Sequence, residues 1–170
     1  MALVPAMLVG WAFSTHYPWI AAVSTLVLAV ASYFDDRQGL PVAFRLAMHI
    51  SVAVVFVLVR ADEVTLVVII VLVLSIAWSI NLYNFMDGAD GLAGGMALFG
   101  FGAYAVAAWL QGATDFASLN MCVASAALGF LIFNFPPART FLGDAGSVPL
   151  GFLAAVFGIV GTSSMLWPWW

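Results

Sequence analysis

The sequence predicts an all-α membrane protein, a single domain over residues 1–170 whose chain crosses the bilayer about six times. Three observations lead to this fold class. The chain has 65% hydrophobic residues and a mean hydropathy of +1.14, whereas the apolar share of soluble domains is about half. Only 7% of its residues are charged. Its long apolar runs approach the ~20 residues that a spanning helix needs.

The charge of the chain argues against nucleic-acid binding, and its cysteine content excludes disulfide-linked and cysteine-metal proteins. Lys and Arg number four and Asp and Glu number eight, which gives a net charge of −4. The chain therefore lacks the basic footprint that binds nucleic acid. Cys122 is the single cysteine, so an intramolecular disulfide and a cysteine-cluster metal site are both excluded.

The first apolar runs are separated by short polar breaks. Residues 1–13 are too short to span the membrane and end at a polar break, residues 14–18, which is flanked by aromatic residues typical of membrane interfaces. We predict a remnant half-helix there and expect the natural fold to begin upstream of it. Residues 18–34 form the first complete span, and residues 40–59 form the second.

The other spans follow the same pattern of apolar runs closed by polar or glycine-rich segments. Residues 64–80 are rich in Val, Ile and Leu, which in a soluble protein would suit buried strands, but their length and hydropathy favour a helix. We predict the last three spans at residues 94–110, 116–133 and 148–165. Neither an internal repeat nor a domain linker interrupts the series.

Three polar segments fall on the same face of the membrane when helix directions are counted along the chain. Asp35 and Asp36 close the first span, residues 81–91 follow the third, and residues 134–147 follow the fifth. Five of the eight acids and three of the four basic residues then share this face, which leaves only Arg60 opposite. The positive-inside rule makes the shared face cytoplasmic.

The residue types on this face suit a phosphorylated substrate. Carboxylate and amide oxygens are the ligands that Mg²⁺ prefers, and Arg binds phosphate through two N–H donors. Glycine-rich helix starts present backbone N–H groups to anions, and here they fall at Gly88, Gly91, Gly143 and Gly146. The sequence therefore predicts a site for a phosphorylated cytosolic substrate, with apolar flanks available to a lipid co-substrate.

Three motifs resemble those of the polyprenyl-phosphate N-acetylhexosamine-1-phosphate transferases, glycosyltransferase family 4. They are the Asp35-Asp36 pair, Asn-x-x-Asn-Phe-x-Asp-Gly-x-Asp-Gly-Leu at residues 81–92, and Asn-Phe-Pro-Pro-Ala-Arg-Thr-Phe-Leu-Gly-Asp-x-Gly-Ser at residues 134–147. They stand in the family's order and at helix ends of the right parity. The third motif discriminates most, and it resembles the GlcNAc-type branch more than the muramyl-pentapeptide branch.

The resemblance implies an activity and its partners. The enzyme would transfer a sugar 1-phosphate, from UDP-GlcNAc or a related UDP-N-acetylhexosamine, to polyprenyl phosphate such as undecaprenyl phosphate, and it would release UMP. It would be a multi-pass protein of the bacterial inner membrane that initiates cell-wall, lipopolysaccharide or related polysaccharide synthesis at the cytoplasmic face. The implied cofactor is Mg²⁺, which Mn²⁺ could replace, and a homodimer is left open.

The resemblance also implies a role for individual residues. Asp144 would bind Mg²⁺ with Asn84 as a second protein ligand, and Asp35, supported by Asp36, would deprotonate or position the polyprenyl phosphate. A base is not essential if the phosphate is already ionised, since its second pKa is near ~6. The implied substrate-binding residues are Arg45 for phosphate, Asn84, Asp87 and Asp90 for the nucleotide or its loop, and Asn134 and Phe141 for the uridine.

Two parts of the family pattern are not found in these 170 residues. They are further helices before the Asp35 motif and a histidine-rich loop near the C-terminal end. His16 and His49 do not replace that loop, because one is predicted on the far face and the other inside the second span. We therefore expect the core portion of a larger fold, with an incomplete site, and a non-catalytic or degenerate fragment stays open as an alternative.

Other interpretations stay open as well. A transporter or channel would use intramembrane acids for cations or protons, but these acids gather at one face. An isoprenoid-transferring enzyme also uses paired acids, but a second Asp-rich helix is not visible. For single residues the simpler interpretations are a solvated helix end at Asp35–Arg37, a snorkelling Arg45, a packed His49, ordinary loop residues at Asp62, Glu63 and Asp115, and close packing at Gly158 and Gly161.

Overall fold

The computed structural model describes residues 3–14, 18–60 and 64–168, and these form helices and their connections without a strand. Six of the helices are long and apolar enough to cross a membrane, and a shorter helix precedes them. The predicted fold class is therefore confirmed, and the chain is a multi-pass membrane protein. The helices are α1 (Leu3–Trp11), α2 (Trp19–Gln38), α3 (Val42–Arg60), α4 (Leu66–Met86), α5 (Leu92–Leu110), α6 (Thr114–Asn134) and α7 (Asp144–Ser163).

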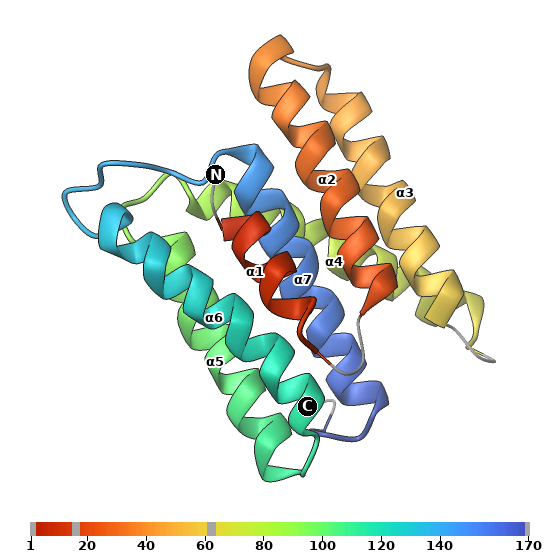
Figure 1. Cartoon of the computed structure of the whole chain (residues 1–170). Helices are drawn as coiled ribbons and strands as arrows, with labels where there is room; N and C mark the ends of the chain where they lie inside the picture. Colours follow the sequence, from red (N-terminus) through yellow and green to blue (C-terminus); the bar gives the residue numbers. More distant parts are fainter. Residues whose placement is uncertain (1–2, 15–17, 61–63, 169–170) are drawn as a thin grey trace.

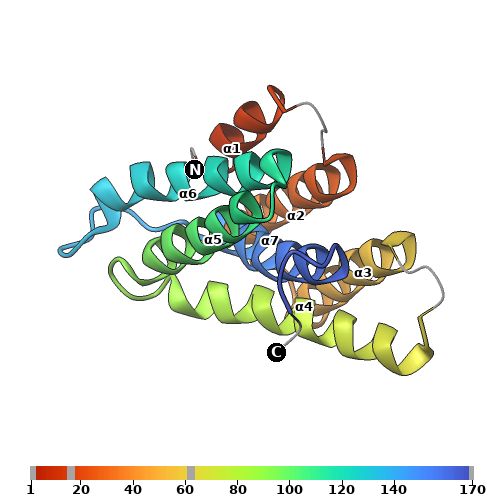
Figure 2. The ribbon, with the colours of Figure 1, turned by 90° about the horizontal axis from the view of Figure 1, so that it is seen from below.

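Helix α7 lies at the centre of the bundle, as Figure 2 shows, and it packs against α2, α4 and α5. In its most apolar stretch 67% of the residues are buried inside the protein, compared with 39% or less in the other spans. Helices α5 and α6 form a closely packed pair on one side, and α3 packs against α4 and α2 on the other. The residues at the start of α7 are therefore surrounded by the ends of other helices.

Helix α2 ends later than the sequence predicts. The hydropathy pattern places its end at residue 34, but the helix continues to Gln38 and carries Asp35 and Asp36 in its last turn. Gly39 ends it in the left-handed conformation, with φ +65°, and donates its N–H to the Asp35 carbonyl at 2.8 Å. This is the usual glycine termination of a helix.

Two further boundaries are also wrong, for the same reason. Helix α4 continues from residue 80 to Met86 and carries Asn81 and Asn84, and α7 begins at Asp144 instead of residue 148. Hydropathy detects only the part of a helix inside the hydrocarbon, which is about 30 Å thick within a bilayer of about 40–45 Å. The polar turns beyond that limit are helical here, so Asp35, Asp36, Asn84 and Asp144 lie on helices and not in loops.

Glycines set the spacing between helices at two places on α7. A Cβ on Gly151 would lie 2.6 Å from the backbone of Ile80, so α4 and α7 approach closely there. Near the other end, Gly158 and Gly161 face aromatic rings and not a helix backbone. The Trp167 ring packs over Gly161, and its Nε1–H donates to the Gly158 carbonyl at 3.3 Å. These glycines therefore allow close packing of the Tyr104 and Trp167 side chains, and not the close approach of two helix backbones that small residues usually permit.

Candidate active site at the common end of the helices

The predicted shared face exists as one end of the bundle, where α2 and α4 end and α3 and α7 begin (Figure 1). Arg45 of α3 connects two of the motifs there. Its Nη1 lies 3.1 Å from Oδ2 of Asp35 and 3.1 Å from Oδ2 of Asp144. Asp35 is only 6% exposed, and its other oxygen accepts the Leu40 N–H at 2.7 Å. The carboxylate of Asp35 is therefore held in one orientation.

Asp36 reaches from α2 to the first turn of α7. Its Oδ1 accepts the Asp144 N–H at 3.3 Å and its Oδ2 accepts the Ala145 N–H at 3.4 Å. A carboxylate at a helix N-terminus satisfies N–H groups that lack a partner inside the helix, and its charge interacts favourably with the helix dipole. Asp36 therefore acts as an external cap for α7.

Asp87 holds the residues just before α7. Its two carboxylate oxygens accept the N–H groups of Leu142, at 3.1 Å, and Gly143, at 2.9 Å. Burial raises the pKa of Asp87 above its usual value, and the charges of Asp144 and Asp36 act in the same direction, while the two hydrogen bonds act against it. The side chain is 6% exposed, so this carboxylate is a structural clamp within the polar cluster.

Asp36 and Asp87 together occupy the backbone N–H groups of residues 142–145. The expectation that the glycine-rich start of α7 presents free N–H groups to a substrate anion is therefore wrong for Gly143. The physical reason is that the carboxylates of Asp36 and Asp87 already accept hydrogen bonds from these N–H groups. An anion at this face must therefore be bound by side chains.

Asn84 connects the second motif to the third. Its side-chain amide lies beside the Asp144 carboxylate, and its Oδ1 accepts a hydrogen bond from the Ser147 hydroxyl at 2.9 Å. Ser147 is fully buried, and its Oγ also lies 2.9 Å from the Gly143 carbonyl. Ser147 was not among the predicted site residues. Its place in the third motif, one helical turn after Gly143, is the signal that could have identified it.

Phe141 lies in an adjoining loop, residues 135–143, which Asn134 of α6 and Asp90 of the turn between α4 and α5 hold in place. Asn134 accepts the Gly91 N–H at 3.0 Å and donates to the Thr140 carbonyl at 2.8 Å, so it ties both sides of the site together. Asp90 accepts the Ala138 N–H at 3.0 Å. Both residues therefore order the loop that carries Phe141, whose ring is 47% exposed beside the polar cluster.

The structure thus divides the predicted residues into two groups. One group forms a continuous network of contacts: Asp35, Asp36, Arg45, Asn84, Asp87 and Asp144. The other group orders or occupies the loop: Asp90, Asn134 and Phe141. His49 lies one turn beyond Arg45 and is 5% exposed, in agreement with a packed histidine. His16, Asp62 and Glu63 lie outside the described residues.

The network fits a cation that takes only a few protein ligands. Among the described residues, no three His, Cys, Asp or Glu side chains group as ligands for a metal ion. Mg²⁺ usually binds through one or two protein oxygens and completes its shell with water and phosphate oxygens. Asp144 and Asn84 can supply two such oxygens. Asp35 and Asp144 share the guanidinium of Arg45, and Asp36 lies against the backbone N–H of Asp144, so further positive charge is favourable there.

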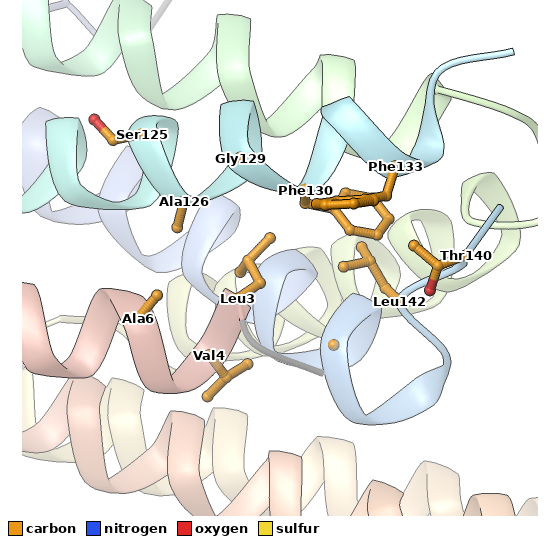
Figure 3. Close-up of a pocket in the computed structure, with 11 residues that line it drawn as sticks. Leu3, Val4, Ala6, Ser125, Ala126, Gly129, Phe130, Phe133, Thr140 and Leu142 are labelled. Carbon is orange, nitrogen blue, oxygen red and sulfur yellow. The ribbon is translucent and has the colours of Figure 1, made fainter. Parts of the chain in front are cut away.

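An apolar cavity of about 430 Å³ adjoins the network (Figure 3). Residues of α1 and α6, the loop and the start of α7 surround it, and none of them is charged. Leu142 and Gly146 line it and flank Asp144 in the sequence. The polar network and this cavity are therefore neighbours, the first suited to phosphate groups and the second to hydrocarbon.

Comparison with known proteins places these features in a family. The sequence model of glycosyl transferase family 4 matches residues 18–162. Proteins named phospho-N-acetylmuramoyl-pentapeptide-transferase are similar to this chain. The one from Geobacillus sp. (strain WCH70) is 37% identical over 138 residues, 81% of this chain and 40% of the relative. The one from Bacillus pumilus (strain SAFR-032) is 46% identical over 134 residues, 76% and 36% of the two chains.

The chain spans about two fifths of the length of these curated relatives. Their names refer to the muramoyl-pentapeptide branch, whereas the third motif predicted the GlcNAc-type branch. The GlcNAc-type assignment therefore stays a prediction.

Proposed function

The chain belongs to glycosyl transferase family 4, and from this premise we propose that it forms the core of a site that transfers a sugar 1-phosphate from a UDP-sugar to polyprenyl phosphate. The observation that carries this proposal is the Arg45 bridge between Asp35 and Asp144. It brings the first and third family motifs together at one end of the bundle. The positive-inside rule supports a cytoplasmic position for that end.

In the proposed reaction, an oxygen of polyprenyl phosphate attacks the β-phosphorus of the UDP-sugar. A new phosphorus–oxygen bond forms, the bond from the β-phosphorus to the bridging oxygen breaks, and UMP leaves with that electron pair. Asp35 is placed to orient the attacking phosphate and to accept its proton when that phosphate is singly ionised, because the Leu40 N–H and Arg45 fix its carboxylate. Arg45 supplies positive charge to the phosphate oxygens.

Asp144 and Asn84 would hold Mg²⁺. When bound, this ion would neutralise negative charge on the pyrophosphate. Asp36 and Asp87 keep the backbone of residues 142–145 in place, so the Asp144 carboxylate stays directed at the site. Phe141, on a loop ordered by Asn134 and Asp90, offers an exposed ring for the uridine base. These residues position the nucleotide and the metal, while Asp35 and Arg45 position the acceptor.

The proposed acceptor is a polyprenyl phosphate such as undecaprenyl phosphate, because an apolar cavity and the bilayer lie beside the polar network. The proposed donor is a UDP-N-acetylhexosamine. The third motif supports GlcNAc-1-phosphate, and the names of the relatives support the muramoyl-pentapeptide sugar. The product would be a polyprenyl-diphospho-sugar that begins a cell-envelope polysaccharide in the bacterial inner membrane.

The test is transfer of radiolabelled sugar 1-phosphate to undecaprenyl phosphate in detergent with Mg²⁺, with UDP-GlcNAc and UDP-MurNAc-pentapeptide in parallel. We expect label in the lipid phase with one of the two donors and its loss in Asp144→Asn. Asp115→Asn, which changes an acid at the other end of the bundle, is the matched control and should keep activity. A folded wild-type chain that labels lipid with neither donor would contradict the proposal and favour a non-catalytic fragment.

A further inference from the structure

The hydroxyl of Ser147 lies between two acceptors but has one hydrogen to donate. Its Oγ is 2.9 Å from Oδ1 of Asn84 and 2.9 Å from the carbonyl of Gly143. Ser147 is fully buried, so water does not take the place of either acceptor. The hydroxyl hydrogen goes to one acceptor or to the other, which gives two possible hydrogen-bond arrangements of the same atoms.

In the first arrangement Ser147 donates to Oδ1 of Asn84, which leaves the amide nitrogen of Asn84 on the side of the Asp144 carboxylate. In the second, Ser147 donates to the Gly143 carbonyl and accepts an N–H from Asn84. The amide of Asn84 is then turned over, and its oxygen faces Asp144. The nitrogen and oxygen ends of an amide are nearly the same size, so the exchange needs no movement of the helices.

The two arrangements differ in what they can hold beside Asp144. An amide N–H next to a carboxylate is stable without a cation. An amide oxygen next to a carboxylate repels it unless a cation lies between them. The second arrangement therefore matches an occupied Mg²⁺ site and the first an unoccupied one.

The surrounding helices keep the relative positions of Asn84 and Ser147 fixed. One turn deeper in the bundle, Gly151 of α7 lies against the backbone of Ile80 of α4, with no space for a Cβ. At the same level the Ser79 hydroxyl donates to the Gly151 carbonyl at 2.8 Å. This contact sets the spacing of α4 and α7 and leaves rotation of the amide as the available adjustment.

We propose that Ser147 is a positioning residue whose hydroxyl changes from donor to acceptor when Asn84 turns its oxygen toward a divalent cation at Asp144. This inference rests on the proposed cation site. It adds that the affinity of that site depends on a residue that never touches the ion.

The experiment is Mn²⁺ binding, measured by electron paramagnetic resonance on the detergent-solubilised chain without substrates. We expect Ser147→Ala to weaken Mn²⁺ binding by about tenfold or more, as is typical when a group that orients a metal ligand is removed. Ser147→Thr, which keeps the hydroxyl, should bind within about threefold of the wild type. Ser163→Ala, at the far end of α7, is the control and should bind as the wild type does. Thermal unfolding confirms that each variant is folded.

The same Ser147→Ala change, made in an Asn84→Asp variant, distinguishes a role in orienting the Asn84 amide from a role in packing. In Asn84→Asp the side chain presents an oxygen in either orientation and needs no partner to turn it. Ser147→Ala should then weaken Mn²⁺ binding by less than about twofold. Wild-type affinity in Ser147→Ala, or an equal loss in both backgrounds, would overturn the proposed role of Ser147. Unchanged binding in Asp144→Asn, or a wild-type chain that binds no Mn²⁺, would overturn the cation site and this inference together.

Discussion

Replacement of Arg45 by Met tests the electrostatic centre of the site directly. The change keeps most of the apolar stem of the side chain and removes the guanidinium that lies 3.1 Å from both Asp35 and Asp144. Asp35 is 6% exposed and would be left as a buried carboxylate with its Leu40 N–H as the remaining hydrogen-bond donor. We therefore expect the folded protein to lose stability.

The structure sets the size of this loss. Breaking a fully buried pair costs about 3–5 kcal/mol, whereas an exposed pair is worth about 0–1 kcal/mol. Arg45 is 36% exposed and Asp35 is buried, so we expect an intermediate loss of about 2 kcal/mol in the free energy of unfolding. For a chain of this length that loss corresponds to a fall in Tm of about 4–8 °C.

The assay is thermal unfolding in detergent, followed by the fluorescence of the tryptophans. Arg139→Met, an exposed arginine in the neighbouring loop, is the matched control and should change stability by less than about 0.5 kcal/mol. In an Asp35→Asn background the loss from Arg45→Met should fall by at least half, since the buried charge is already gone. Equal Tm values for Arg45→Met and the wild type would show that Arg45 only snorkels to solvent, and would refute the bridge.

Two further predictions concern Asp87 and Gly151. Because burial raises the pKa of Asp87, the folded protein binds its proton more tightly than the unfolded chain does. Its contribution to stability is then complete below the unfolded pKa of about 3.9 and is lost as pH rises through the raised value. The Tm of the wild type minus the Tm of Asp87→Asn should therefore be larger at about pH 4 than at about pH 7. The same difference in Tm at both pH values would contradict the raised pKa. Gly151→Ala should lower stability by about 1–3 kcal/mol, because the new Cβ would meet the backbone of Ile80 at 2.6 Å. Gly100→Ala, which has open space around the new Cβ, should be neutral or stabilising in the same unfolding assay.

Hydropathy and helix direction were sufficient to predict the six spans and the face that their polar ends share. They failed at the ends of α2, α4 and α7, where Asp35, Asn84 and Asp144 continue the helices. The failure has a physical cause, because a polar residue at a helix end is stable in the helix when a partner from another helix satisfies it. Those partners are distant in sequence, as in the contact between Asp36 and the N–H of Asp144, 108 residues away. A single sequence carries no signal for such pairings.

The roles of the acids follow from the donors that hold each carboxylate. A carboxylate offers two oxygens, and in Asp36 and Asp87 both already accept backbone N–H groups of residues 142–145. Losing those bonds would release the start of α7, so neither is free to move with a substrate. Asp35 and Asp144 instead share one guanidinium, whose long and partly exposed side chain can exchange its contacts for phosphate oxygens without unfolding anything. The family resemblance assigns Asp36 to the support of Asp35 and Asp87 to the nucleotide or its loop, whereas the geometry shows that both hold the start of α7. It leaves Asp35 and Asp144, which share Arg45, as the two acids that can engage a phosphate or a cation.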